Sequence, residues 1–316
     1  MRTDPVSFLR TRALSAPELK RLDKVDCSRF EKALESGVEV TTEADFGEDL
    51  RMISFPPPAL FVWGDKSALK RPMVAIVGTR GASTYGKAVA RKFSEAMAQA
   101  GLTVVSGGAL GIDEHAHIGA LDVAGLTVVA LANGVEKAQP PRNKPLFDRV
   151  RASGCLVSPY AVGTPALPEN FRQRNVLIAA MAKAVIVIEA PAGSGALMAA
   201  GAAADLGREV FVVPGPINSV NFNGSHNLIR DGATLVFHPG QVLEALDFEA
   251  PAEVERSTAD NEAQRSILAA LEAEPLAVEV IATRTDLDST EVTTELTMME
   301  IEGLVVRNEL GYTVKP

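Results

Sequence analysis

Short, uninterrupted apolar runs that alternate with amphipathic stretches restrict the fold of this chain more than any other feature. Runs such as Ala184–Ile188 (AVIVI) are typical of strands buried on both faces, which occur in parallel sheets covered by helices. The chain is therefore predicted to be an α/β protein with a mostly parallel sheet and helices on both faces. Strands are predicted near residues 73–78, 103–106, 126–131, 155–158, 184–188, 210–213 and 234–237. Helices are predicted near residues 84–100, 112–124, 144–153, 172–183, 195–206 and 239–246.

Ligands of such sheets bind at the carboxyl ends of the strands, so the loops that leave those ends are examined first. The first one follows the run Val74–Val77 and reads Gly78, Thr79, Arg80. A glycine turn between a buried strand and a helix can hold a phosphate on backbone N–H groups, and a guanidinium can pair with it through two hydrogen bonds. An ordinary strand–turn–helix unit with a solvated arginine has the same spacing. The pattern alone leaves both interpretations open.

Composition limits the class of protein. The 316 residues are 47% hydrophobic and 5% aromatic, which is typical of a globular chain of about two domains. No apolar run is long enough for a membrane span, and the N-terminus lacks the apolar core of a signal peptide. Two cysteines, Cys27 and Cys155, favour a reduced, cytoplasmic setting without a disulfide framework or a zinc site.

The net charge of −9 is unevenly distributed along the chain. Residues 71–240 hold 15 basic and 11 acidic side chains, net +4, whereas residues 241–316 hold 5 and 17, net −12. A mildly basic central region can bind an anion. The acidic tail either contacts another protein or serves solubility.

Four parts of the chain are predicted. Residues 1–55 form a small helical N-terminal segment with a helix start at Ser15, residues 56–246 the α/β domain, and residues 247–261 an acidic linker. Residues 262–316 resemble a small winged helix with helices near 262–273, 276–283 and 289–302 and a hairpin near 304–314. Its third helix carries glutamates and no basic residue, so we predict contact with protein rather than with DNA.

The second loop contains Ser106, Gly107 and Gly111, and its glycines let the backbone approach a ligand. The G-x-G-x-x-G turn of dinucleotide enzymes and its acidic partner are missing, so no nicotinamide cofactor is predicted. The sequence Asp113-Glu-His115-Ala-His117 suggests a metal site, but the two histidines point to different sides of a helix and Asp113 is better explained as a helix cap. We therefore predict neither a metal nor another cofactor.

The segment from Pro159 to Arg174 contains Phe171, Arg172 and Arg174. An aromatic ring beside cations is how single-stranded nucleic acid is held, because bases stack on the ring and phosphates pair with the cations. A phenylalanine packed under its own loop is the alternative. A further turn at Pro191–Gly195 opens a helix in the manner of an anion-binding site.

Six motifs occur in an order and spacing that resemble the DNA processing protein A family (DprA), also called Smf. They read VAIVGTR, VVSGGALGIDEHAH, NFRQRN, GSGALMAA, GREVFVVPG and HNLIRDGA, and the resemblance covers residues 56 to about 245, with a tail like the winged helix of the family. It implies an extended Rossmann-like domain that binds single-stranded DNA, forms a homodimer and loads the RecA recombinase onto incoming DNA in natural transformation and recombination. It implies no catalysis.

The resemblance carries DNA-binding roles over to matching positions. In the first turn, Arg80 would meet a phosphate, and Phe171 would face a base. The positions are Gly78, Thr79, Arg80, Ser106, Gly107, Gly111, Phe171, Arg172, Arg174, Asn175, Ser194, Gly195 and Asn227. Two features depart from the family: Leu110 stands where an arginine is usual, and the N-terminal segment is short for a complete sterile-alpha-motif-like domain.

Two other functions are compatible with parts of the sequence. Nucleotide phosphoribohydrolases of a related Rossmann-like family have a P-G-G-x-G-T-x-x-E loop, but here Ala196 and Ala199 stand at the threonine and glutamate positions. Without that carboxylate the acid/base group of such chemistry is missing. The second alternative is a protein-interaction scaffold that acts through its acidic winged helix.

Overall fold

The computed structural model describes residues 27–41, 48–53, 56–57, 59–249, 262–301, 304–308 and 310–314. The chain divides into two compact units, Met1–Pro251 and Ala252–Pro316. This division falls inside the range 247–261, where the sequence predicts a linker. The helix start predicted at Ser15 lies outside the described residues.

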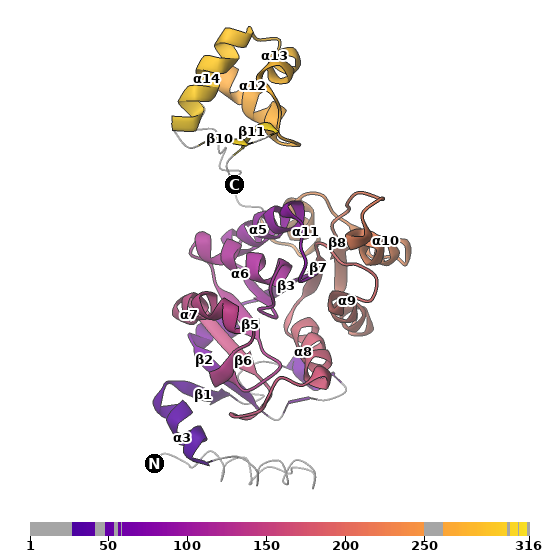
Figure 1. The fold of residues 1–316 in the computed structure, drawn as a ribbon. Coiled ribbons are helices and arrows are strands. Elements are labelled where there is room, and N and C mark those ends of the chain that lie inside the picture. Colours follow the sequence, from indigo (N-terminus) through magenta and orange to yellow (C-terminus); the bar gives the residue numbers. More distant parts are fainter. Residues whose placement is uncertain are drawn as a thin grey trace. The chain divides into compact units, whose positions relative to one another are not determined.

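A nine-stranded sheet forms the centre of the larger unit, in the order β1-β2-β6-β5-β4-β3-β7-β8-β9 (Figure 1). Strands β3 to β9 are mutually parallel, whereas β2 runs antiparallel to β6 and β1 antiparallel to β2. The mostly parallel α/β fold is therefore confirmed. The strands are β1 (Val38–Thr41), β2 (Leu60–Gly64), β3 (Met73–Val77), β4 (Thr103–Ser106), β5 (Thr127–Ala130), β6 (Gly154–Ser158), β7 (Ala184–Val187), β8 (Glu209–Val212) and β9 (Thr234–Leu235).

Helices cover both faces of this sheet. They are α3 (Cys27–Glu35), α5 (Thr84–Gln99), α6 (Ile112–Asp122), α7 (Lys144–Ser153), α8 (Pro168–Met181), α9 (Gly195–Asp205), α10 (Asn223–Arg230) and α11 (Pro239–Ala245). Short 3-10 turns are η1 (Glu48–Arg51), η2 (Lys66–Lys70), η3 (Val135–Lys137), η4 (Pro141–Asn143) and η5 (Val220–Phe222).

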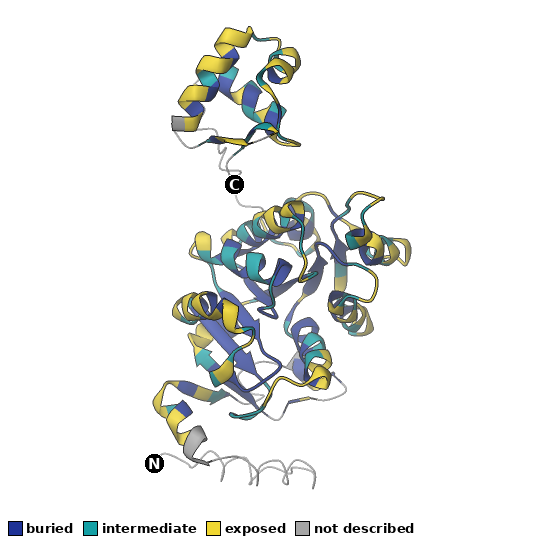
Figure 2. Ribbon diagram, viewed as in Figure 1, coloured by how far each residue is buried: buried dark blue, intermediate teal, exposed yellow. Residues whose placement is uncertain are grey.

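The alternation of side chains along the buried strands explains the two layers of helices. In β3, Val74 and Ile76 pack into the cluster that includes α5, α6 and α11, whereas Ala75 and Val77 pack into the cluster that includes α8 and α9. Figure 2 shows the result, a buried sheet between helices whose outer faces are exposed. Both faces of β3 are therefore in the core, as its unbroken apolar run predicts.

Two elements differ from the sequence-based prediction. The segment 1–55, predicted to be helical, contains strand β1, whose register with β2 pairs Val38 with Trp63. Only two positions of β1 are buried, which leaves no apolar run to predict it from. Helix α8 begins at Pro168 rather than near residue 172, because proline is well suited to the first helical position. Phe171 and Arg172 consequently lie on the helix and not in a loop.

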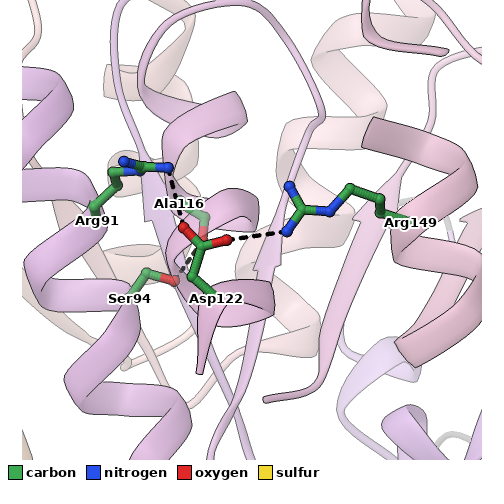
Figure 3. A network of polar contacts seen from close by, with 5 residues as sticks. All are labelled: Arg91, Ser94, Ala116, Asp122 and Arg149. Carbon is green, nitrogen blue, oxygen red and sulfur yellow. Dashed lines mark hydrogen bonds and ion pairs between the residues drawn. The ribbon is translucent and has the colours of Figure 1, made fainter. Parts of the chain in front are cut away.

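Helices α5, α6 and α7 are also joined by ion pairs on their exposed side (Figure 3). Asp122 accepts hydrogen bonds from Arg91 and from Arg149, at 3.0 Å in each case. Beneath them, the buried hydroxyl of Ser94 on α5 donates to the carbonyl of Ala116 on α6. Because exposed pairs of this kind contribute about 0–1 kcal/mol each, apolar packing dominates the stability of this face.

The smaller unit has the winged-helix arrangement that the sequence predicts. Its elements are α12 (Glu262–Leu271), α13 (Val278–Thr285), α14 (Ser289–Ile301), β10 (Val305–Asn308) and β11 (Gly311–Val314). The two strands form an antiparallel hairpin, and its core contains Ile267, Ile281 and Leu296. Among the described residues, no helix of either unit is long and apolar enough to cross a membrane.

We expect the stability of the larger unit to fall on acidification because of one buried histidine. His117 on α6 is fully buried, and burial lowers the pKa of its imidazole from 6.5 to about 3. Thr127 donates its hydroxyl proton to Val104, so Nδ1 of His117 donates to Thr127 Oγ1 at 2.7 Å, and the lowered pKa keeps the ring neutral at pH 7. The unfolded chain takes up a proton below pH 6.5 while the folded chain does not, so stability is lost as the pH falls from 6.5 towards 3. Between pH 7.5 and pH 5 this amounts to about 2 kcal/mol.

Urea unfolding at the two pH values tests this expectation. Trp63, the single tryptophan, lies in β2 and reports on the larger unit alone. His117→Leu is the matched variant, since leucine fills the site without titrating. If the variant and the wild type lose the same stability between pH 7.5 and pH 5, His117 does not titrate as described.

Candidate nucleic-acid interface

A cavity of about 380 Å³ lies at the carboxyl edge of the sheet. Its walls are the turn after β3, part of the loop after β4, one side of α8, and the loop after β7 with the start of α9. Since β4 and β7 flank β3 on opposite sides, the order of the strands reverses at this point. Open α/β sheets bind their ligands at such a switch point.

Most of the residues predicted from sequence come together here. The ones that line the cavity are Gly78, Thr79, Arg80, Phe171, Arg172, Arg174, Asn175, Ser194 and Gly195. Ser106, Gly107 and Gly111 do not line it: Ser106 ends β4, and the two glycines lie in the loop between β4 and α6. Asn227 is exposed on α10 and does not line the cavity either.

Phe171 is the aromatic residue of this site, and it lies between two arginines. The guanidinium carbon of Arg80 is 5.5 Å from the centre of the Phe171 ring, and that of Arg174 is 5.7 Å from it. Distances below about 6 Å allow a cation–π attraction. Phe171 is partly exposed, so the ring is not enclosed by its own helix and presents surface to the cavity.

Arg174 differs from the other two arginines because it is only 5% exposed. Its Nη1 donates to the carbonyls of Gly107 (2.6 Å) and Ala130 (3.0 Å), and its Nε donates to Asn175 (3.1 Å). Burial lowers the pKa of its guanidinium, and the nearby carboxylate of Asp113 opposes that shift. Arg174 thus ties α8 to the ends of β4 and β5 and is not a mobile surface cation.

Asp113 completes this buried cluster. Its carboxylate accepts from the N–H groups of Gly107 (3.1 Å) and Ala109 (3.4 Å). The N-cap of α6 is Gly111, so the interpretation of Asp113 as a helix cap is wrong. Burial raises the pKa of Asp113, against the opposing effects of Arg174 and of the loop N–H groups.

The two supporting glycines act through shape. A Cβ on Gly107 would lie 1.9 Å from Arg174 Nη1, which leaves room only for glycine beneath the guanidinium. Gly111 has φ +85°, and a Cβ there would lie 2.4 Å from the carbonyl oxygen of Thr79. Both glycines therefore let the second loop approach the first turn and Arg174 closely.

The open side of the cavity is cationic. Arg80 and Arg172 are exposed, and neither makes an ion pair with a described residue. The amino end of α9 adds a partial positive charge, with Ser194 as its cap and Asn175 bonded to the carbonyl of Gly195 at 3.0 Å. Ala196 and Ala199 also line the cavity, at the positions where a phosphoribohydrolase has threonine and glutamate.

Metal ligands do not gather in the described parts of the chain, where no group of three or more His, Cys, Asp or Glu side chains is placed to hold a metal ion. His115 contacts the carbonyl of Gly111 through Nδ1 at 3.0 Å, and His117 is bonded to Thr127. The two histidines thus have different partners, His115 at the start of α6 and His117 on β5.

Sequence reasoning missed the groups that hold the first turn. Glu189, Ser83 and Asn221 are joined by hydrogen bonds behind Arg80, and none was predicted as a site residue. One signal was available, because Glu189 is a carboxylate that directly follows the apolar run Ala184–Ile188. A charged side chain at the end of a buried strand requires partners that the sequence does not reveal.

The chain is similar in sequence and fold to several known proteins. Protein Smf of Escherichia coli (strain K12) is 38% identical over 266 residues, which are 81% of this chain and 71% of that protein. DNA processing protein A from Streptococcus pneumoniae superposes with a TM-score of 0.66 and 32% identity, over 79% of this chain and 88% of that chain. DNA processing protein A from Helicobacter pylori, from a structure that gives insight into its unique single-stranded DNA binding mode, superposes with a TM-score of 0.62 and 27% identity. The match covers 68% of this chain and 99% of that chain.

Two family descriptions account for both units of the chain. Residues 249–309 match the DprA winged helix domain. Residues 38–247, which include every strand of the large sheet and every wall of the cavity, match DNA recombination-mediator protein A. The chain therefore belongs to the DNA recombination-mediator protein A (DprA/Smf) family.

Proposed function

We propose that the cavity binds single-stranded DNA with little sequence preference. The observation that carries this proposal is the partly exposed ring of Phe171, with the guanidinium groups of Arg80 and Arg174 within 6 Å of its centre, at a cavity where Arg80 and Arg172 form no ion pair with a described residue. A base stacks on any aromatic face, and the backbone phosphates pair with the arginines. In this arrangement Phe171 stacks on a base, Arg80 and Arg172 meet phosphates, and Arg174 holds the floor of the site.

The wider role that we propose is that of a recombination mediator. The protein protects incoming DNA and loads the RecA recombinase onto it during natural transformation, and it acts as a cytoplasmic homodimer without catalysing a reaction. Family membership supports this role, together with the alanines at the positions of the phosphoribohydrolase acid/base loop.

The winged helix is proposed to contact a protein. Helix α14 carries Glu291, Glu295 and Glu300 and no basic residue. A helix of this charge repels phosphates, whereas the recognition helix of a DNA-binding winged helix carries Arg or Lys.

We expect binding of a labelled single-stranded oligonucleotide to weaken strongly with salt, and Arg80→Ala to reduce that dependence. Arg80, Arg172 and the amino end of α9 provide for about three phosphates, so log K should fall with log salt at a slope of about −2, and Arg80→Ala should lower the magnitude of the slope by about 0.7. Fluorescence anisotropy between low and moderate salt measures both quantities.

Arg149→Ala is the matched control, because Arg149 is an exposed arginine of α7 that pairs with Asp122 and does not line the cavity. It should leave the slope almost unchanged. A salt-independent affinity, or equal effects of the two variants, would contradict phosphate binding in the cavity.

A further inference from the structure

Glu189 is a fully buried carboxylate just beyond the carboxyl end of β7. Among the described residues, no Lys, Arg or His forms an ion pair with it. Hydrogen-bond donors compensate the carboxylate instead. Ser83 donates its N–H at 3.1 and 3.2 Å and its hydroxyl at 2.8 Å, and the amide of Asn221 donates to the other oxygen. A buried carboxylate is tolerated only where such donors are held in place.

These bonds converge on the turn that carries Arg80. The backbone carbonyl of Glu189 accepts from the N–H of Thr79 at 2.7 Å, and its carboxylate accepts from Ser83. Asn221 bridges the two, because its amide also donates to the carbonyl of Gly81 at 3.3 Å. The turn is therefore bonded on both sides of Arg80, whose side chain then reaches the Phe171 ring.

Helix α5 approaches the carboxylate closely at Gly86. A Cβ on Gly86 would lie 2.0 Å from Glu189 Oε2, so glycine is required there. Tyr85, in the first turn of α5, donates its hydroxyl to the carbonyl of Pro214 at 3.2 Å. Burial, and after it the charge of Glu189, raises the pKa of this tyrosine. Glu189 itself does not line the cavity, so it can influence a bound ligand only through the turn.

We propose that Glu189 is a positioning residue for DNA binding: through Ser83 and Asn221 it holds the Thr79–Ser83 turn in the conformation that presents Arg80 to a phosphate. This inference rests on the proposed DNA-binding function. It adds a carboxylate, which a DNA phosphate would repel, to the residues on which binding depends. It also assigns Asn221 to the site, as the residue that links the Glu189 carboxylate to the carbonyl of Gly81.

A double-mutant cycle tests the proposal. Glu189→Gln keeps the volume and removes the charge, and Asn221→Ala removes the bridging donor at a partly exposed position. Each should weaken single-stranded DNA binding at least about twofold, because couplings between residues of one hydrogen-bond network begin at about that size. Neither should weaken binding more than Arg80→Ala does. In the Arg80→Ala background, neither change should weaken binding further.

Hydrogen exchange supplies a measurement that needs no DNA. Amides of residues 79–86 should exchange faster in Glu189→Gln and in Asn221→Ala than in the wild type. The control is Ser94→Ala, which removes the buried hydrogen bond from Ser94 on α5 to the carbonyl of Ala116 on α6 (Figure 3). It should change neither the affinity nor the exchange of those amides. Trp63 fluorescence confirms that each variant is folded.

The outcomes separate this inference from the proposed function. The positioning role is refuted, while DNA binding stands, if folded Glu189→Gln and Asn221→Ala bind DNA as tightly as the wild type. It is also refuted if their losses of binding free energy add to the loss caused by Arg80→Ala. If the wild type binds no single-stranded DNA, or Arg80→Ala binds as tightly as the wild type, the proposed function fails and the inference fails with it. Faster exchange at residues 79–86 would then show only that Glu189 holds the turn.

Discussion

Replacement of Arg174 with methionine is expected to lower the free energy of unfolding of the larger unit by about 2–5 kcal/mol, because two buried carbonyls lose their charged donor at about 1–3 kcal/mol each. The guanidinium is 5% exposed and bonds to the carbonyls of Gly107 and Ala130. Methionine fills much of the same volume but leaves those carbonyls without this donor. It also leaves the buried carboxylate of Asp113 without its neighbouring positive charge. Urea unfolding followed by Trp63 fluorescence measures the loss.

Arg172→Met is the matched control for this experiment. Arg172 is exposed on the same helix, two residues away, and surface substitutions usually change stability by less than about 0.5 kcal/mol. Adding Asp113→Asn to Arg174→Met should recover part of the loss, because an uncharged amide is easier to bury than a carboxylate. If Arg174→Met and Arg172→Met lose equal stability, Arg174 is a surface cation and the buried cluster has no structural role.

Truncation of Phe171 is expected to weaken single-stranded DNA binding by about 1–3 kcal/mol, or roughly 5- to 150-fold, which is the contribution of one stacked base. The ring is partly exposed at the cavity, and the guanidinium groups of Arg80 and Arg174 lie within 6 Å of its centre. Phe171→Ala should therefore change the affinity far more than the stability. Anisotropy titration and urea unfolding of the same preparation separate the two effects.

Two conservative variants refine the interpretation. Phe171→Trp keeps an aromatic face and should bind nearly as well as the wild type. Phe171→Leu keeps apolar volume without a ring face and should resemble Phe171→Ala. If leucine restores binding, the side chain acts by packing, as in the alternative in which Phe171 packs under its own loop.

The sequence predicted the walls of the cavity better than its internal bonding. Gly78, Arg80, Phe171 and Ser194 were selected because glycine turns, cations and aromatic residues carry local signals, and all four line the cavity. Asn227 was selected from a motif alone, and it lies apart on α10. Arg174 is predicted from sequence as a DNA-binding cation, yet its side chain is buried. The spacing of three arginines does not reveal which of them is buried.

The sequence by itself determined the alternation of strands and helices, the parallel core and the loops that meet at its carboxyl edge. Those features follow from the period of apolar residues and from the turn residues between them, which act over a few neighbouring positions. Only the tertiary structure decided that Glu189 meets Ser83 across 106 positions of sequence and that Arg174 reaches Gly107 across 67. Such contacts depend on the order of strands in the sheet, which brings distant loops together, and no local pattern records which buried charge will find which donor.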